Sequence, residues 1–542
     1  MTDAKAIIDD QARLEQRRQS FTTWWHQIAQ RVLPAEAQFT VSTDEGSKRI
    51  ERVFSAKPIT DNERFAAVMD EMLTPRSQIW HIMAAPDEES GQSSDVKQYL
   101  ERLNKLLFAM RYRPRANFAA QKHQGYLSVG AFGNSCLYID EEVGKGPRYK
   151  QIPMREVVWS MNHQGQIDTL YRKFSLTRRQ AEQRAAEEGW TLPAKITGEK
   201  NPEREFDFVH CVRPNLERIA SREDYRGWPW SSTYVAVDDK MIVHDGGYRA
   251  WPYAIGRYML ATGESYGRSP AMAAWPAILT LNEEKKTILR AGQREVEPPL
   301  LLTEDGALEP FNMRPGALNH GTLSDQGDPL VAPLKIGSNV PLGMELMSLE
   351  MADIEEAFLV SVFKILSEHP QMTATQVLEI VQLRATLLAP MMGRQHSEDL
   401  GPLIEREVDL LAHDSRFTWI TEEMPDELRE RGGDYKVEYR SPLARAMRAQ
   451  DGVAIMRTLE VLPAAAAIDK NALLVIDVPG ATRELAEING MPAKFIRDAD
   501  TVAQLMEQQA EADETASALA VAPELSQAAL NAAKAEQLRS GA

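Results

Sequence analysis

Two stretches decide the fold: Ser269–Gln293, which reads SPAMAAWPAILTLNEEKKTILRAGQ, and Gly343–Leu366, which reads GMELMSLEMADIEEAFLVSVFKIL. In both, apolar residues recur at steps of three and four, and this period predicts one long amphipathic helix for each. A helix of 25 residues is about 37 Å long. Pro298-Pro299 ends the first helix, because proline cannot continue one. Two antiparallel helices joined by a Pro/Gly-rich excursion favour a structure that lines a passage over one that encloses a small substrate.

Shorter helices are predicted on both sides of this pair. After a loop, a third helix runs from Ala374 to about Pro390, with a continuation toward His413. Near the N-terminus, apolar residues at helical spacing extend from Leu14 to Val32, where Pro34 stops the helix. Further helices are expected at Asp61–Leu73 and from Ser94, which acts as N-cap.

The region from 135 to 260 changes character, because short β-prone runs alternate with Gly, Pro and Asn turns. One helix interrupts the runs, with Thr177 and Gln180 spaced as a capping box and Gly189 at its end. The protein is therefore expected to be mixed α+β and mostly helical. The expected strands are Gln78–Met83, Cys136–Asp140, Val157–Met161, Asp168–Phe174, Phe206–Val212, Ser232–Val237, Tyr253–Leu260, Phe417–Ile420 and Tyr435–Tyr439.

Composition limits the classes of function. The 542 residues predict three or four domains, and 62 Lys and Arg against 79 Asp and Glu give a formal charge of −17. That charge argues against tight, nonspecific duplex binding. Cys136 and Cys211 are too few for a disulfide framework or a four-cysteine zinc site. No secretion signal or membrane-length apolar run is present, so we expect a soluble protein that stays in the cell that makes it, without membrane association.

One motif suggests catalysis. Gly263-Glu264-Ser265-Tyr266-Gly267 matches the G-x-S-x-G of a hydrolase nucleophile elbow and lies between a strand and a helix. The alternative is a glycine-rich turn that leads into the first long helix, with Ser269 as N-cap and Pro270 at the first helical position. A serine hydrolase that uses Ser265 therefore stays open as an alternative. We find no phosphate-binding loop and no histidine spacing for a metal, so no catalytic residue, cofactor or metal is assigned.

Charges along the two long helices suggest a second kind of role. On an isolated helix these side chains form a solvated face; around a pore they form rings. Acidic rings would repel a polyanion inside such a pore and keep it centred, while a few bases would make brief contacts. Acidic and basic stripes on opposite sides of each helix are expected to pair between neighbouring copies. The candidates for lining a channel are Lys285, Lys286, Arg290, Glu345, Glu350, Asp353 and Lys364.

The order of segments along the chain resembles the head-to-tail connector (portal) proteins of short-tailed bacteriophages. The chain departs from the family pattern at Ser55 and Gln376, where an acid is commoner, and neither position affects the architecture. The matching pieces, in order, are Arg17-Arg18 with Trp25 and Leu33-Pro34, Arg52-Val53-Phe54, Lys57-Pro58, Leu73-Thr74-Pro75 with Trp80, Gly130-Ala131-Phe132-Gly133-Asn134, Gly263 to Pro270, Pro298-Pro299, Met372 to Val377, and Ser441 to Ala446.

The resemblance implies a portal fold assembled as a cyclic ring, a dodecamer, around a central channel. It implies a wing at 1–264, stem helices at 265–293 and 341–366, a clip at 294–340, a second part of the wing at 374–440, and a crown with an Ala-rich tail at 441–542. From Glu507 onward large apolar residues are scarce, so this tail is expected to be a solvated bundle or disordered. The tunnel loop that faces DNA would comprise Ser367, Glu368, His369, Pro370, Gln371, Met372 and Thr373.

The same resemblance implies the partners and the place of action. They are eleven further copies, double-stranded DNA passing without sequence specificity, the terminase large subunit, tail adaptor or nozzle proteins, and the major capsid, scaffolding and internal core proteins. The protein would assemble in the host bacterial cytoplasm and act at one vertex of the capsid in the virion, in genome packaging and ejection. It would be no enzyme. A helical adaptor that binds only protein partners remains a third alternative.

Overall fold

The computed structural model describes residues 3–41, 43–44, 46–50, 53–87, 93–142, 144–302, 312, 314, 316–318, 322–324, 326–334, 340–360, 391, 393–440, 452, 454–463, 476–488, 502, 505 and 508. The chain divides into two compact units, Met1–Ala444 and Arg445–Ala542, and each is considered by itself.

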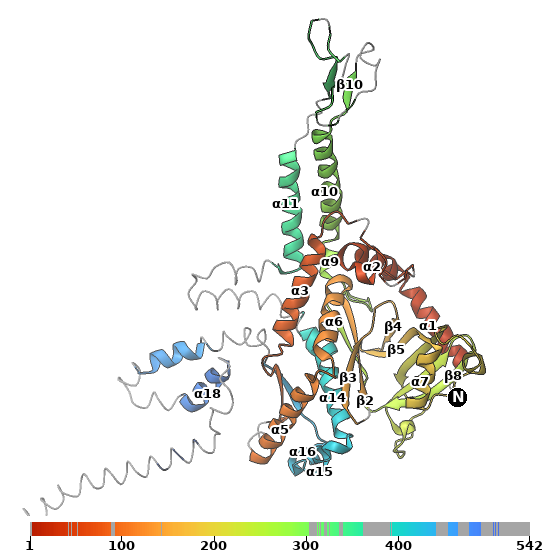
Figure 1. Cartoon of the computed structure of the whole chain (residues 1–542). Coiled ribbons are helices and arrows are strands. Elements are labelled where there is room, and N and C mark those ends of the chain that lie inside the picture. Colours follow the sequence, from red (N-terminus) through yellow and green to blue (C-terminus); the bar gives the residue numbers. More distant parts are fainter. Residues whose placement is uncertain are drawn as a thin grey trace, which may run out of the picture. The chain divides into compact units, whose positions relative to one another are not determined.

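The first unit is a mixture of helices and strands, as expected (Figure 1). Its helices are α1 (Ala4–Arg17), α2 (Gln19–Val32), α3 (Lys57–Leu73), α5 (Ser94–Arg111), α6 (Phe118–Phe132), α7 (Arg178–Glu188), α8 (Ala194–Thr197), α9 (Pro270–Ala273), α10 (Trp275–Val296), α11 (Val340–Ala357), α14 (Gly401–Ala412), α15 (Trp419–Glu422) and α16 (Asp426–Glu430). Short 3-10 turns are η1 (Pro34–Glu36), η2 (Tyr225–Gly227) and η5 (Ser415–Phe417), and η4 (Gln395–Leu400) is a π-helix.

Two antiparallel sheets form the centre of this unit. The five-stranded sheet has the order β4-β5-β6-β7-β8, and the three-stranded sheet has the order β3-β2-β9. Two further pairs, β1 with β12 and β10 with β11, are also antiparallel. The strands are β1 (His81–Ala84), β2 (Asn134–Glu142), β3 (Gly146–Gln151), β4 (Val157–Met161), β5 (Ile167–Thr177), β6 (Glu205–Pro214), β7 (Trp230–Ala236), β8 (Met241–Tyr248), β9 (Tyr253–Arg257), β10 (Leu300–Leu302), β11 (Val331–Pro333) and β12 (Lys436–Tyr439).

One hydrophobic core of the described residues joins segments that are far apart in the sequence. Helices α5 and α14 pack their apolar faces against β1, β2 and β3, with Leu103, Ile139 and Leu403 among the buried side chains. Inside this core Arg111 forms an ion pair with Glu407, and both side chains are almost fully buried. Because an unpaired buried charge is costly, this pair fixes α14 to α5.

The second unit contains α18 (Val478–Ile488) and a helical run at 454–463. Gly452 lies close to α18, since a Cβ on this glycine would be 3.1 Å from Ile488 Cγ2.

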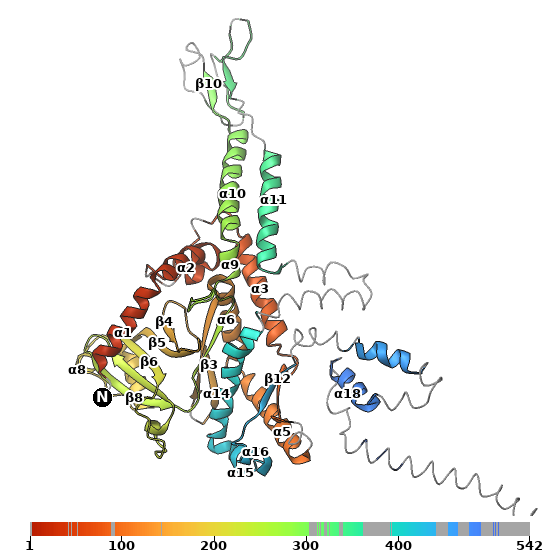
Figure 2. The same cartoon turned by 180° about the vertical axis from the view of Figure 1, so that it is seen from behind.

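The long helices α10 and α11 lie side by side and project from the sheets (Figures 1 and 2). The prediction of one continuous helix over Ser269–Gln293 is wrong, because the chain breaks at Ala274 into α9 and α10. Pro276 explains the break, since it cannot donate the hydrogen bond to the carbonyl four residues earlier. Helix α10 continues to Val296.

The second long helix is also shorter at its C-terminal end than predicted. Helix α11 stops at Ala357 rather than Leu366, and Leu359 has a positive φ of 58°. A left-handed residue cannot continue an α-helix, so the chain turns away there. Residues 361–366 lie outside the described part of the chain, and so does the third helix at Ala374–Pro390. The continuation toward His413 is confirmed as η4 followed by α14.

Several local predictions were wrong. The first helix is two helices, broken at Arg18, whose guanidinium donates to the carbonyls of Met154 and Val157. Phe417–Ile420 is helical rather than a strand, and β1 starts at His81 rather than Gln78. The N-cap of α5 is Ser93 rather than Ser94. The capping box of Thr177 and Gln180 and the C-cap Gly189 are confirmed.

Candidate functional site

The α10–α11 pair carries most of the predicted functional residues. Its contact surface is built from apolar side chains, of which Leu281 and Ile354 are completely buried. Gly343 allows the helices to approach, because a Cβ at this position would lie 2.9 Å from Ile288 Cδ1. The pair is therefore a packed two-helix element.

An ionic bridge ties the base of this pair to α3. Lys57 Nζ, on α3, donates to Asp61 Oδ1 at 2.7 Å and to Glu355 Oε1 on α11 at 2.7 Å. Asp61 is fully buried; burial raises the pKa of its carboxyl, and Lys57 opposes that rise. One lysine thus neutralises two carboxylates from different helices.

Two further contacts hold the same region. The backbone N–H of Phe54 donates to Asn282 Oδ1 on α10 at 2.8 Å. The ring of Phe358, at the end of α11, meets Phe65 of α3 edge to face with centroids 6.3 Å apart. Both long helices are therefore fixed near their base.

The outer faces of the pair expose charge. Glu345 and Asp353 are exposed on α11, and Arg290 is exposed on α10. Glu350 differs, because it lies near Glu284 of α10. Burial of Glu284, and after it the negative charge of Glu350, raise the pKa of the Glu284 carboxyl. Only some of the predicted acids thus share one exposed face.

Two of the three predicted bases on α10, Lys285 and Lys286, are half-buried. Lys286 forms an ion pair with Glu283 at 2.9 Å, and its ammonium lies 5.7 Å from the ring centroid of Phe54. Lys285 is likewise partly covered. Lys364 and the predicted tunnel loop Ser367–Thr373 lie outside the described residues. That these side chains face DNA stays a prediction.

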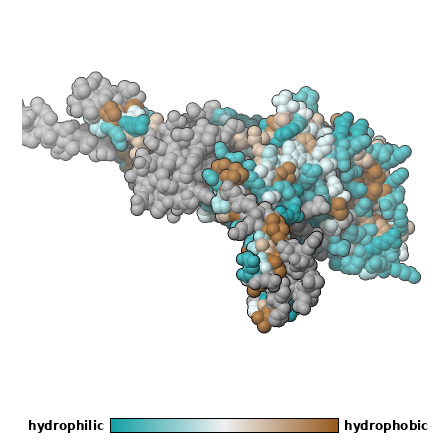
Figure 3. All heavy atoms as spheres, turned by 90° about the horizontal axis from the view of Figure 1, so that it is seen from above, coloured by the Kyte–Doolittle hydropathy of each residue, from teal (hydrophilic) through white to brown (hydrophobic). Residues whose placement is uncertain are grey.

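Apolar side chains are also exposed on the two helices, and Figure 3 shows such atoms reaching the surface of the projecting part. Native monomers rarely expose large contiguous apolar patches, so such a surface indicates an interaction site. Leu279 and Leu289 on α10 and Met344 on α11 are 37–62% exposed. We give the name apolar stripe to Leu342, Leu346 and Leu349, which share one face of α11 at steps of four and three and are 45–61% exposed.

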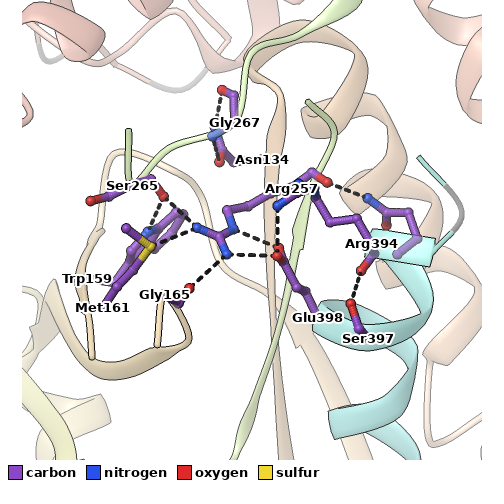
Figure 4. Close-up of polar contacts among 11 residues, drawn as sticks. Asn134, Trp159, Met161, Gly165, Arg257, Ser265, Gly267, Arg394, Ser397 and Glu398 are labelled. Carbon is purple, nitrogen blue, oxygen red and sulfur yellow. Dashed lines mark hydrogen bonds and ion pairs between the residues drawn. The ribbon is translucent and has the colours of Figure 1, made fainter. Parts of the chain in front are cut away.

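The G-x-S-x-G segment forms a structural joint rather than a nucleophile elbow. Ser265 lies eight residues after the end of β9 and five before α9, so it is not at a direct strand-to-helix turn. Its backbone carbonyl accepts hydrogen bonds from Trp159 Nε1 at 3.1 Å and Arg257 Nη1 at 3.2 Å (Figure 4). Within the described residues, no hydrogen bond joins Ser265 to a histidine.

The neighbouring glycine of this segment meets a second motif of the sequence. Asn134, the first residue of β2, is hydrogen-bonded to Gly267 (Figure 4). Gly133, the C-cap of α6, lies against the same glycine. A Cβ on Gly267 would lie 2.4 Å from the carbonyl oxygen of Gly133. Next along the chain, Ser269 caps α9 by accepting from the N–H of Met272, with Pro270 at the start, as predicted.

Arg257 links this joint to the π-helix η4. Its Nε and Nη2 donate to both carboxylate oxygens of Glu398, at 2.7 and 2.8 Å (Figure 4). Gln395 donates to the carbonyl of Arg257, and Lys122 forms a buried ion pair with Asp399. Three side chains of η4, from Gln395, Glu398 and Asp399, thus anchor the chain just after the undescribed residues 361–390.

These residues differ in how readily they can be recognised from the sequence. Lys57 and Asp61 have the spacing of an ion pair on one helix, a signal that was available but not used. Asn134 and Gly267 stood inside motifs but 133 positions apart. Arg257 and Glu398 belong to no motif, and only the fold brings them together.

Metal and membrane roles find no support within the described part of the chain. Its residues include no group of three or more His, Cys, Asp or Glu side chains that could hold a metal ion. Cys136 and Cys211 are buried and free, and burial raises the pKa of both thiols. None of the described helices has the length and apolar character needed to span a bilayer.

Comparisons with known proteins cover nearly the whole chain. A family model described as bacteriophage head to tail connecting protein matches residues 4–496. The chain is 25% identical over 543 residues to the probable portal protein of Bordetella phage BPP-1, an alignment that spans 98% of this chain and 95% of that protein. It is 22% identical over 539 residues to the portal protein of Salmonella phage epsilon15, with 97% and 95% covered.

Proposed function

The chain belongs to the family of bacteriophage head to tail connecting proteins, and on this premise we propose that it assembles into a cyclic ring whose channel passes the genome. The observation that carries this proposal is the α10–α11 pair, a long two-helix element fixed at its base and apolar on part of its outer face. A single copy leaves this apolar surface in water. A ring covers it, because each copy can place one face of the pair against a different face of the next.

The charges of the pair support its role as a channel wall. Duplex DNA binds tightly wherever several phosphates are neutralised, because counterions are released. Exposed Glu345 and Asp353 on α11 oppose such binding, so the duplex can slide. We propose twelve copies, with Lys285, Lys286, Arg290, Glu350, Lys364 and the loop Ser367–Thr373 as further channel candidates.

The remaining parts fit the other steps of this role. Residues 294–340 would dock the terminase large subunit and then the tail adaptor or nozzle proteins. Residues 1–264 and 374–440 would form the wing, with the crown at 441–542. The major capsid, scaffolding and internal core proteins are the proposed partners at the capsid vertex, after assembly in the host cytoplasm.

Ring assembly can be tested by charging the apolar stripe. Leu346 and Leu349 are 45% and 61% exposed, so a Leu346→Glu and Leu349→Glu double variant should fold normally. It should fail to form the annular particles that the unaltered chain forms in electron micrographs. The control is Leu216→Glu, at a side chain that is 95% exposed on the loop between β6 and β7. Rings in the double variant, or a monomeric unaltered chain at micromolar concentration, would refute the proposed interface.

A second experiment tests the channel wall. In Glu345→Lys and Asp353→Lys rings, basic rings replace acidic ones, and a duplex should be retained on a filter at low salt. The unaltered rings should release it. Equal retention by both would show that these acids do not face DNA.

A further inference from the structure

A recess of about 230 Å³ lies where the C-terminal end of α5 meets the turn before β3 and η5. Four of its eight wall residues are cationic, Arg113, Arg115, Lys145 and Arg416, and none is acidic. Gly146 keeps the recess open, because a Cβ at this residue, whose φ is 105°, would lie 2.5 Å from Met110 Cε. We call this feature the cationic recess.

One wall of the recess is held in place before any ligand arrives. Asp414 accepts hydrogen bonds from Nε of Arg416 at 2.9 Å, and Arg416 Nη1 donates to the carbonyl of Gly144 at 2.8 Å. Arg416 Nη2 also pairs with the Asp414 carboxylate, so this guanidinium stiffens the wall and its own charge is offset. The charge for an oxyanion comes from the other cations of the wall, above all Arg113, because guanidinium N–H groups match both oxygens of a carboxylate or phosphate. Preorganisation also reduces the entropic cost of binding.

A hollow of opposite charge lies along the same helix. It has a volume of about 760 Å³ and includes Tyr99 and Arg102 of α5. Arg102 and a second arginine in its wall, Arg429, pair with Glu423 and Asp426, so acids still outnumber bases there by six to two. Tyr99 and Met110 are eleven residues apart on α5, which places the two features about 16 Å from each other. We call this feature the acidic hollow, after its carboxylates Asp95, Glu422, Glu423, Asp426, Glu427 and Glu430. Figures 1 and 2 show α5, α15 and α16 together at the end of the first unit farthest from β10.

We propose that this surface binds a protein segment with acidic side chains for the cationic recess and basic side chains for the acidic hollow about 16 Å away. A duplex is disfavoured because it carries one negative charge per about 1.7 Å of its axis. A phosphate in the recess would bring neighbouring phosphates toward the six carboxylates. A peptide with both signs of charge satisfies both features.

Synthetic peptides can test this preference on the full chain. Sixteen ångströms correspond to about five extended residues. The probe is a fluorescein-labelled peptide of four glutamates, five Gly/Ser residues and four lysines. Comparison probes are a peptide with glutamate in both blocks and a 12-base-pair duplex. Fluorescence anisotropy at low salt should show the mixed peptide binding at least tenfold more tightly than either.

Charge reversal then locates the site. Arg113→Glu should weaken binding of the mixed peptide about tenfold, and Asp426→Lys should weaken it independently at the other feature. Arg179→Glu is the matched control, because Arg179 is exposed on α7 outside both features. Circular dichroism verifies that each variant is folded.

Four results would overturn the proposal. They are tighter binding of the duplex, equal binding by all variants, no binding of the mixed peptide, and loss of ring formation in Arg113→Glu. The last result would assign this surface to contacts between copies. A failure of the unaltered chain to form rings would instead contradict only the proposed function, because the anisotropy measurement does not depend on rings.

Discussion

Asn134 satisfies both backbone polar groups of Gly267. Its Oδ1 accepts from the Gly267 N–H at 2.7 Å, and its Nδ2 donates to the Gly267 carbonyl at 3.1 Å. The asparagine is fully buried, so no water can replace these bonds. Two motifs that the sequence places 133 residues apart are thus one joint between α6 and the segment that leads into α9.

Removal of this side chain should destabilise the protein strongly. Asn134→Ala leaves a buried N–H and a buried carbonyl unpaired, at about 1–3 kcal/mol each. We expect a loss of about 2–4 kcal/mol in the free energy of unfolding, measured by urea titration. Asn201→Ala, at an exposed asparagine, should change stability by no more than about 1 kcal/mol. Equal losses in both variants would contradict the assigned role.

Lys57→Met should loosen the base of the α10–α11 pair. The fully buried carboxylate of Asp61 then keeps only Arg64, at 3.6 Å, and a broken buried pair costs about 3 kcal/mol. The control is Lys105→Met, because Lys105 pairs with Glu101 at the same spacing but on an exposed surface, where such pairs contribute less than about 1 kcal/mol. Asp61→Asn in the Lys57→Met background should recover part of the loss. No recovery would indicate that Lys57 acts through packing rather than charge.

His396 should make the protein sensitive to mild acid. Burial lowers the pKa of this imidazole to about 4, and the ring stacks on Tyr439 with centroids 3.6 Å apart. The unfolded chain binds a proton near pH 6.5, and the folded chain does so only near pH 4. Protonation of His396 therefore does not oppose folding above about pH 6.5, and the free energy of unfolding falls as the pH drops from 6.5 toward 4.

Substitution of this histidine gives the measurement. The loss in the free energy of unfolding is at most about 3 kcal/mol for this pKa shift, and the partial exposure of the imidazole reduces it. His396→Phe keeps a ring against Tyr439 but cannot be protonated. Its thermal midpoint should fall less between pH 7 and pH 5 than that of the unaltered chain. Parallel curves for the two proteins would exclude His396 as the source.

Ser265 should be chemically inert. In this turn the backbone carbonyl of Ser265 accepts two hydrogen bonds, and a side-chain substitution leaves that carbonyl in place. A fluorophosphonate probe should not label the protein, and Ser265→Ala should form rings normally. Labelling of the unaltered chain that disappears in Ser265→Ala would restore the hydrolase alternative.

Regular patterns were predicted well, and positions where one residue overrides a pattern were not. Val157–Met161 matched a strand at both ends, because its β-branched and aromatic residues lie between clear turns. The break at Ala274 was missed although Pro276 is visible in the sequence, since the apolar period continues through it. Leu359 carries no such signal, because leucine has no intrinsic preference for the positive φ that it adopts here.

Strands with a weak apolar pattern were also missed. β3 contains Gly146, Pro147 and Lys150, and β8 contains Gly246 and Gly247, so neither alternates cleanly. Their neighbours in the sheet, rather than their own propensities, determine that they are extended. The ion pair of Arg257 with Glu398 depends on the same long-range arrangement.

The break at Ala274 has a mechanical consequence. Helix α10 extends about 33 Å beyond it, so a tilt of about 5° at this point displaces Val296 by about 3 Å. Such a rotation requires neither α9 nor α10 to unwind. Two contacts near the base of the pair oppose this rotation. The Asn282 hydrogen bond holds α10, and the Lys57 bridge holds the neighbouring helix α11. Changes of a few tenths of an ångström at these two contacts are therefore enlarged at the far end of α10, where the chain passes into β10.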